Sequence, residues 1–194
     1  MANGKIFDRT PFTEVYVQPA AGDAGLAVGA AYFVEHQTLG RPRTFVMDHA
    51  YWGPGFTSAQ IREAIARSRI SNIGCRVSEL PAEELTKMAA KHIADGRIVG
   101  WFQGRTEWGP RALGNRSIVA DPRRAEMKDV LNQRIKHREP FRPFAPSILE
   151  EATGDFFERS DPSPFMTLAY PVRAEKRALI PRSEERRVGK ECRL

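Results

Sequence analysis

The stretch GRTEWGPRALGNRS, residues 104–117, indicates the topology of the chain because an apolar run flanks it on each side. RIVGWF (97–102) precedes it, and SIVAD (117–121) begins at its last residue. Short apolar runs bounded by turn-forming residues predict buried strands. The sequence therefore predicts two strands with a Gly- and Arg-rich turn between them.

Helices are predicted on both sides of these strands. One covers 57–69 with Thr57 or Ser58 as its cap, and a second runs from about Pro81 to Gly96. Asp121 as N-cap, followed by Pro122, predicts the start of a third helix with an inward apolar side. Since strands and helices mix and no repeat is visible, the predicted fold class is α/β (mixed α+β).

The N-terminal part of the chain predicts a strand and a helix. EVYV (14–17) alternates like a strand, and DAGLAVGAAYFVEH (23–36) predicts a buried helix rich in Ala and Gly. Glycine costs about 1 kcal/mol relative to alanine inside a helix, so these glycines predict close approach of another backbone or of a ligand. Asp23 is a candidate N-cap of this helix.

Composition divides the chain into three parts. LGRPRTFVMDHAYWGPG (39–55) is rich in Gly, Pro and aromatic residues without periodicity, so we place a domain boundary between domains 1–55 and 56–181. The second domain ends on a strand-like run, FMTLAY (165–170). Residues 182–194 have no apolar period and resemble vector read-through, although an ordinary solvated tail fits the same composition.

The charge distribution predicts an anionic partner. The formal net charge is +6, and residues 97–142 contain eleven Lys or Arg against five Asp or Glu, which equals that excess. A phosphorylated small molecule, a nucleic acid and plain solvent all fit a basic face of this kind. The residue pattern has to separate them.

Composition also favours a reducing compartment. Cys75 and Cys192 are too few and too far apart for a disulfide framework. The sequence contains neither an apolar run of signal-peptide length nor the roughly 18 apolar residues that a membrane helix needs. We therefore expect a cytoplasmic protein without a membrane partner.

The turn over 104–117 has the chemistry of an anion site. It places Arg105, Arg111 and Arg116 among three glycines, with Glu107 available to orient an arginine or a substrate amide. Glycines let backbone N–H groups approach an anion, and arginine matches phosphate oxygens bidentately. A polyphosphate or an acyl phosphate fits this pattern, and so does a solvated surface turn.

A second basic cluster follows in KHREPFRPFAP (136–146). Lys136, Arg138 and Arg142 lie within seven residues, and the prolines and phenylalanines stiffen the backbone around them. In a strand, Lys136 and Arg138 would point to the same face, where two cations converge on one phosphate. This second cluster favours a phosphate site over a merely solvated turn.

Two segments carry a resemblance to a known family. EWGPRALGNRSIVADPR (107–123) and NQRIKHREPFRPFAPSIL (132–149) together resemble the C-terminal domain of the nodulation and antibiotic O-carbamoyltransferases. ANGKIF (2–7) and PAAGDAGLAVGAA (19–31) are similar to the end of that family's N-terminal, actin-like domain. The resemblance spans nearly all of the chain before residue 182.

The resemblance implies a fold and an activity. It implies a YrdC-like domain, a twisted mixed sheet with flanking helices, preceded by a remnant of an actin-like ATPase-type domain. The YrdC-like domain of such enzymes forms carbamoyl-adenylate from carbamoyl phosphate and ATP with Mg²⁺. The actin-like domain then transfers the carbamoyl group to a hydroxyl of a small-molecule or sugar acceptor.

The resemblance also assigns roles to residues. It implies that Arg111, Lys136 and Arg142 are the catalytic cations at the nucleotide and carbamoyl phosphate site. The residues that it implies in ligand binding around them are Arg105, Glu107, Arg116, Ser117 and Arg138. Fixed cations of this kind stabilise the charge that develops on the α-phosphate and on the leaving pyrophosphate, so no nucleophilic side chain is needed.

Asp23 corresponds in this resemblance to an aspartate that helps to hold a metal ion, Fe²⁺, beside two histidines from an earlier part of the family's sequence. The four histidines here, His36, His49, His92 and His137, lack that paired spacing, so we interpret them as ordinary structural or surface residues. The family's late S-x-N segment is also absent. We expect a truncated chain that is inactive alone.

Two other functions use similar features. A basic module that holds RNA fits the charge, but Phe141 and Phe144 lie in a Pro-rich stretch, which favours packing over base stacking. Threonylcarbamoyl-adenylate synthesis for tRNA modification uses a similar fold, but the GPRALGNRS turn is typical of carbamoyltransferases. The sequence does not identify the acceptor or the oligomeric state.

Overall fold

The computed structural model describes residues 3–68 and 70–181, and its fold is of the predicted mixed α and β class. Strands β1 (Val99–Phe102) and β2 (Arg116–Val119) form a two-stranded antiparallel sheet. Val99 pairs with Val119, and Phe102 pairs with Arg116. Both strands predicted around the Arg-rich turn are thus confirmed, and the turn links them as a hairpin.

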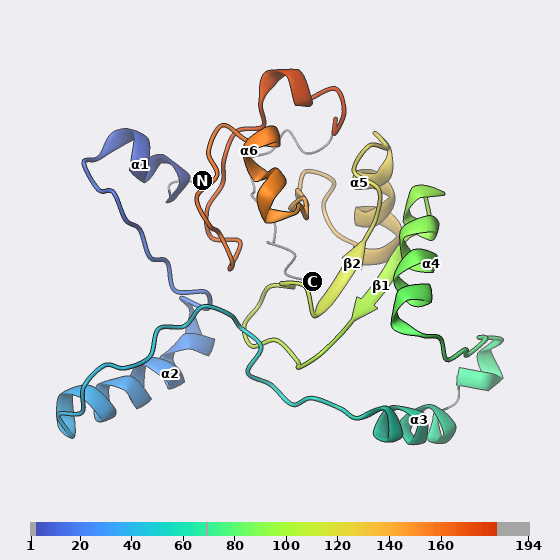
Figure 1. The fold of residues 1–194 in the computed structure, drawn as a ribbon, viewed down its shortest axis with the longest axis horizontal. Helices are drawn as coiled ribbons and strands as arrows, with labels where there is room; N and C mark the ends of the chain where they lie inside the picture. The colour runs from blue at the N-terminus through green and yellow to red at the C-terminus, as the bar shows by residue number, and fades with distance from the viewer. Residues whose placement is uncertain (1–2, 69, 182–194) are drawn as a thin grey trace.

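Helical segments surround this hairpin (Figure 1). The α-helices are α1 (Ile6–Arg9), α2 (Asp23–Phe33), α3 (Ser58–Arg67), α4 (Ala82–Ala94), α5 (Met127–Val130) and α6 (Thr153–Phe156). Two π-helical turns continue α2 and α5, over Val34–Thr38 and Leu131–Lys136. Short 3-10 turns cover Asn3–Lys5, Ile70–Ile73, Glu150–Ala152 and Ala174–Lys176.

The cap predicted for α3 is confirmed, and α4 forms where a helix was predicted. The Thr57 hydroxyl accepts from the Gln60 backbone N–H, and the Gln60 side chain accepts from the Thr57 N–H at 2.8 Å, which makes a reciprocal capping box. Pro81 stands at the N-cap position of α4, and this helix ends before Gly96, which has a positive φ of 83°. Turn-forming residues therefore set both helix boundaries.

The predicted helix over 23–36 forms, but it is not buried. No residue of α2 is buried, and an apolar pocket of 390 Å³ separates its Ala27–Tyr32 side from Phe45, Met47, Trp52 and Trp108. The close approach predicted from the glycines occurs at Gly25, where an added Cβ would overlap the Ala20 carbonyl oxygen. Asp23 is the first helical residue and not the N-cap, which is Gly22.

Three further predictions from the sequence are wrong in detail. EVYV (14–17) and FMTLAY (165–170) do not form strands, because neither run has a neighbouring strand to pair with. Asp121 caps a turn, since its carboxylate accepts from the Arg123 backbone N–H at 3.0 Å, and the helix begins only at Met127.

The main apolar core lies in the C-terminal part of the described chain. Five buried residues form it: Phe157, Leu168, Tyr170, Val172 and Ile180. Phe7 and Val15 from the N-terminal part pack against it. The N-terminal segment is also fixed by hydrogen bonding, because the Asn3 side chain donates to the Thr167 carbonyl oxygen at 3.0 Å.

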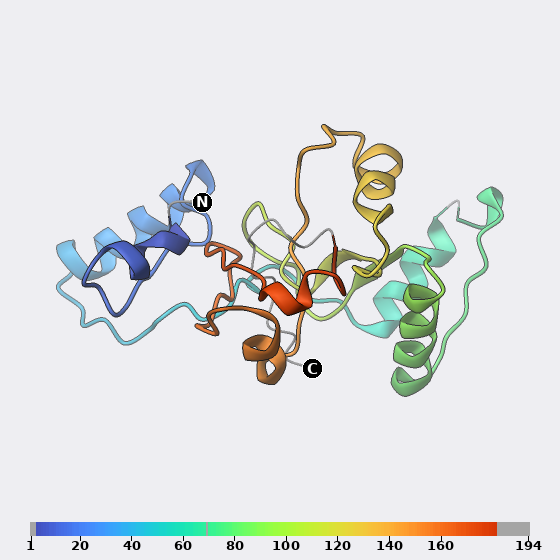
Figure 2. The same ribbon diagram turned by 90° about the horizontal axis from the view of Figure 1, so that it is seen from above.

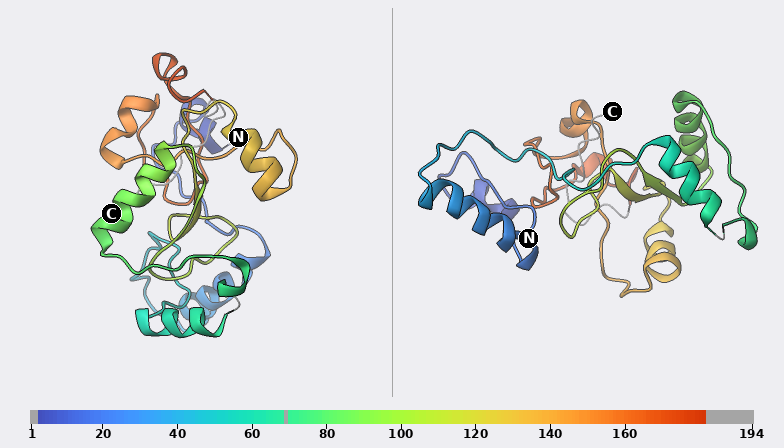
Figure 3. Two further views of the ribbon diagram at one scale, coloured as in Figure 1. Left: turned by 90° about the vertical axis from the view of Figure 1, so that its right-hand side faces the viewer. Right: turned by 90° about the horizontal axis from the view of Figure 1, so that it is seen from below.

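The arrangement in space is extended. Figures 1 and 2 show α1 and α2 at one end, α3 and α4 at the other, and residues 150–181 between α1 and the hairpin. The views in Figure 3 agree, with the connection from α2 to α3 running along the molecule. Within the described part of the chain, none of the helices has the length and apolarity to cross a membrane. The proposed non-native tail, 182–194, lies outside the described residues.

Candidate functional site

Glu107 organises the Arg-rich turn from inside. Its side chain is fully buried, and its two carboxylate oxygens accept from the backbone N–H groups of Leu113 (2.8 Å) and Asn115 (2.7 Å). The same carboxylate lies 3.3 Å from Nε of Arg116. Of the two roles expected for Glu107, the structure contains the contact with an arginine, and the contacts of Glu107 with the backbone fix the shape of the turn.

Arg116 ties the two halves of the turn together. Its guanidinium donates to the carbonyl oxygens of Gly109 and of Arg111, the latter at 3.3 Å. Gly104 and Gly114 have φ values of 60° and 123°, which favour glycine, so the turn could not follow this path with larger residues there. Arg111 is half-buried beside these contacts, and the turn presents it on a fixed backbone.

Arg105 joins the turn to the connection that precedes α3. Its guanidinium donates to the carbonyl oxygens of Gly53 (2.8 Å) and Trp52 (3.1 Å). Next to it, the Gly53 N–H donates to the Thr106 carbonyl oxygen at 2.8 Å, and the Thr106 N–H donates to the Pro54 carbonyl oxygen at 2.9 Å. Arg105 therefore uses its guanidinium for backbone contacts within the chain.

The second basic cluster is not a strand, so the predicted side-by-side presentation of Lys136 and Arg138 is wrong. Lys136 is the last residue of the π-helical turn Leu131–Lys136, and His137 then adopts the left-handed conformation with φ 46°. A left-handed residue after a helix reverses the chain and satisfies the last carbonyl groups. The two cations consequently lie on either side of a helix end.

The three cations of this cluster have different environments. The Arg138 guanidinium donates from Nε to Asn132 Oδ1 at 2.7 Å and lies 4.6 Å from the centre of the Phe144 ring. Arg142 is exposed and lies 3.9 Å from Glu139. Lys136 is exposed, and no described residue forms an ion pair with it. Lys136 and Arg142 are therefore the accessible cations of the cluster.

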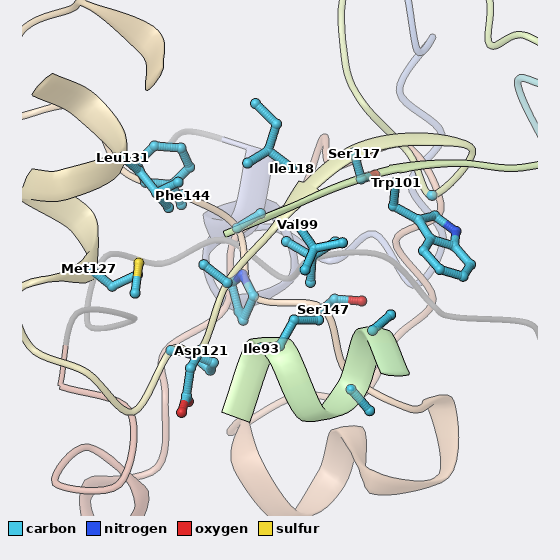
Figure 4. Close-up of a pocket in the computed structure, with 18 of the residues that line it drawn as sticks. Ile93, Val99, Trp101, Ser117, Ile118, Asp121, Met127, Leu131, Phe144 and Ser147 are labelled. Atoms are coloured by element: carbon cyan, nitrogen blue, oxygen red, sulfur yellow. The ribbon is translucent and has the colours of Figure 1, made fainter. Parts of the chain in front are cut away.

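A pocket of 580 Å³ lies where the two motif segments meet. It is lined by α4, both strands, residues 120–131 and residues 144–147, and Ser117 is among its polar lining groups. Figure 4 shows Val99 of the sheet pointing toward Ile93 of α4, and Leu131 and Phe144 also line the pocket. Pockets that hold small ligands have about this volume and apolar character.

The polar rim of this pocket includes residues that the sequence patterns did not predict as site residues. Asp121, Arg124 and Lys128 line it, whereas Arg111, Lys136 and Arg142 do not. Asp121 is buried, and its hydrogen bond with the Arg123 guanidinium lowers the pKa of the Asp121 carboxyl. The pattern ADPRR (120–124) could have predicted the pairing of Asp121 with Arg123, because a carboxylate two residues before an arginine in a Pro turn is suited to local pairing.

The residues present do not build the iron site that the resemblance implies. Asp23 is exposed at the start of α2, and the described residues contain no group of three or more His, Cys, Asp and Glu side chains able to hold a metal ion. We therefore assign no reaction step to a metal held by these side chains. Asp23 as an iron ligand stays a prediction.

The arrangement suits one class of ligand. The turn 104–117 offers a backbone held rigid by Glu107, and the loop after Lys136 offers exposed cations. The pocket between the two segments is mostly apolar with cations at its rim. A molecule with a planar or apolar part and a phosphate fits this combination better than a wholly polar one.

Two protein-family models match the chain. A family model described as "Carbamoyltransferase C-terminus" matches residues 90–186, which are 97 of the 194 residues. A second model, "Carbamoyltransferase N-terminus", matches residues 1–32. The C-terminal match contains both motif segments and all lining residues of the 580 Å³ pocket except Thr86 and Ala89.

Sequence alignments with individual relatives extend over most of the chain. Nodulation protein NolNO of Sinorhizobium fredii is 46% identical over 92% of the chain, and nodulation protein NolO of Bradyrhizobium diazoefficiens is 45% identical over 90%. The uncharacterized protein sll1178 of Synechocystis is 44% identical over 97%. The chain spans 26% to 32% of the length of these three relatives.

Proposed function

The chain belongs to the carbamoyltransferase family, and we propose that it supplies part of the site where carbamoyl phosphate and ATP form carbamoyl-adenylate. In this proposal residues 56–181 are part of a YrdC-like domain, and residues 1–55 are the end of an actin-like transfer domain. The whole enzyme then transfers the carbamoyl group to a hydroxyl of a small-molecule or sugar acceptor in the cytoplasm.

One observation supports the proposal most directly. The two motif segments meet at one pocket of 580 Å³, and the turn on its border is held rigid by a buried carboxylate, Glu107. Groups fixed before the ligand arrives stabilise developing charge without reorganising, which is the largest contribution in many enzymes. A phosphoryl site needs this rigidity.

The proposed reaction balances with water as a reactant. Carbamoyl phosphate, ATP and water give carbamoyl-adenylate, phosphate and pyrophosphate. Water attacks the phosphorus of carbamoyl phosphate, and the P–O bond to the carbamoyl group breaks, which releases phosphate and leaves carbamate. A carboxylate oxygen of this carbamate then attacks the α-phosphorus of ATP. The bond from the α-phosphorus to the bridging oxygen of the β-phosphate breaks, and pyrophosphate leaves. Arg111, Lys136 and Arg142 are proposed to bind phosphate oxygens and stabilise the charge that moves to the leaving group.

The other predicted residues have supporting roles in this proposal. Glu107 and Arg116 hold the turn, and Arg105 fastens it to the connection. Arg138 packs between Asn132 and Phe144, and Ser117 lines the pocket. Magnesium is expected to arrive with ATP, bound to its phosphates, and we assign no protein ligand to it.

Tryptophan fluorescence tests the proposal. Trp101 lies in β1 at the 580 Å³ pocket and Trp108 lies in the turn, so a Trp52→Phe variant keeps both reporters and removes the tryptophan that belongs to neither. Titration with carbamoyl phosphate, and separately with ATP and Mg²⁺, is expected to give saturable changes that Lys136→Ala weakens at least tenfold. A chain without a saturable response, or an unchanged midpoint in Lys136→Ala, contradicts the proposal.

The same titration separates the two alternative functions. Threonine with bicarbonate and ATP should leave the fluorescence response to ATP unchanged, and a cooperative response to the three together would favour threonylcarbamoyl-adenylate synthesis. An RNA oligonucleotide should bind weakly. Tight binding of many RNA sequences, lost steeply as salt increases, would favour an RNA-binding module.

A further inference from the structure

Asn132 is a fully enclosed polar residue that lies four residues before the second basic cluster. It lies in the π-helical turn Leu131–Lys136, and its exposed fraction is 0%. Buried polar side chains are nearly always hydrogen-bonded, and an unpaired one costs about 1–3 kcal/mol. The buried amide of Asn132 therefore needs hydrogen-bond partners, and these partners identify the part of the chain that it holds.

The Asn132 side chain holds three points of the following loop, residues 137–142. Its Oδ1 accepts from Nε of Arg138 at 2.7 Å. Its Nδ2 donates to the carbonyl oxygens of Pro140 (3.3 Å) and Arg142 (3.0 Å). The amide thus uses its acceptor and both its donors on one loop.

The backbone of Asn132 adds two more contacts to the same loop. Its carbonyl oxygen accepts from the N–H of His137 and from the N–H of Arg138, the latter at 3.1 Å. The Arg138 guanidinium also lies over the Phe144 ring, 4.6 Å from its centre, and Phe144 lines the 580 Å³ pocket together with Leu131. A single buried residue consequently determines the path of the backbone from His137 to Arg142.

We propose that Asn132 is a positioning residue for phosphate binding, which fixes where Lys136 and Arg142 present their charges at the two ends of the loop. This inference rests on the proposed function, in which those cations bind carbamoyl phosphate or ATP. Because Asn132 is fully buried, it acts through the loop and does not touch the ligand.

The chemistry of the site requires an amide and not a carboxylate. An aspartate at this position keeps an acceptor for Arg138 but turns its second oxygen toward the carbonyl oxygens of Pro140 and Arg142. Two acceptors that face each other repel. Asn132→Asp therefore keeps the contact to Arg138 and loses the contacts to Pro140 and Arg142, which fix the end of the loop. Asn132→Ala removes all three side-chain contacts.

The test compares three variants of the full chain. Asn132→Asp and Asn132→Ala are measured beside Thr153→Ala, a matched control that loses one buried hydrogen bond, to the Leu149 carbonyl oxygen at 3.3 Å, away from the loop. Affinity for carbamoyl phosphate is measured by calorimetry, and amide hydrogen exchange over residues 137–142 is measured without ligand.

Both Asn132 variants are expected to bind carbamoyl phosphate at least tenfold more weakly and to exchange faster over residues 137–142, while Thr153→Ala keeps the affinity. An Asn132 variant with affinity within twofold of the unmodified chain would overturn the positioning role. A proportional loss in Thr153→Ala would overturn it too, since stability alone would then explain the effect. Absence of binding in the unmodified chain contradicts the proposed function instead, and removes the premise of this inference.

Discussion

Glu107 carries more of the local structure than any arginine beside it. A carboxylate that accepts two backbone N–H groups in a buried position leaves both unpaired when it is removed. Glu107→Ala is therefore expected to lower the free energy of unfolding by about 3 kcal/mol, measured by urea denaturation. Glu151→Ala, at an exposed position, serves as the control and should stay within about 0.5 kcal/mol. Equal effects of the two substitutions would refute the structural role of Glu107.

Tyr170 makes stability depend on pH in the alkaline range. Burial raises the pKa of its phenol from 10.0 to about 12, with the nearby Asp161 acting in the same direction. Between these values the unfolded chain releases the phenolic proton while the folded chain keeps it. The free energy of unfolding should therefore be fully retained below pH 10 and fall as the pH rises toward 12.

Tyr170→Phe tests this directly. Within the described residues the Tyr170 hydroxyl has no hydrogen-bond partner, so its removal should leave stability equal or higher below pH 10. The variant should also lose less stability than the unmodified chain at about pH 11.5, measured by urea denaturation at both pH values. Identical alkaline losses in the two proteins would show that another group is responsible.

At the residue scale, sequence patterns identified the Arg-rich turn and its glutamate but missed Asn132. A Gly- and Arg-rich run is recognisable because its composition is unusual. Asn132 stands in a helical segment with no local signal, and its role appears only when residues 137–142 fold back onto it. Contacts made by chain reversal are invisible to a local pattern.

At the scale of elements, α2 offers a matched pair of glycines. An added Cβ at Gly25 would overlap the Ala20 carbonyl oxygen, whereas at Gly29 it would meet nothing within 4 Å. Gly29→Ala should therefore raise the free energy of unfolding by about 0.5–1 kcal/mol, while Gly25→Ala should lower it. Urea denaturation followed by circular dichroism measures both. Stabilisation by both substitutions would contradict the close turn before α2.

Elements with strong local signals were predicted well from the sequence. The capping box at Thr57 and Gln60, Pro81 before α4, and the apolar runs of β1 and β2 each specify structure through neighbours in the chain. EVYV (14–17) failed as a strand because β-structure needs a partner strand, which an alternating pattern does not provide.

At the scale of the whole molecule, the chain exposes an unusually large surface. Its accessible area is 13588 Å², whereas a compact monomer of 21.8 kDa exposes about 9,300 Å². Large apolar side chains such as Val46 and Phe141 are 79% and 74% exposed. Local contacts, such as those of Glu107 and Asn132, must therefore hold the proposed site in shape, because general packing contributes little there.

In the proposed function, the chain binds carbamoyl phosphate through its two motif segments. The most direct measurement is calorimetry of carbamoyl phosphate binding to the unmodified chain and to Arg111→Ala and Lys136→Ala, at low and at moderate salt. We predict saturable binding with one ligand per chain, weakened at least tenfold in both variants. Binding that is absent, or that both variants retain, would contradict the claim.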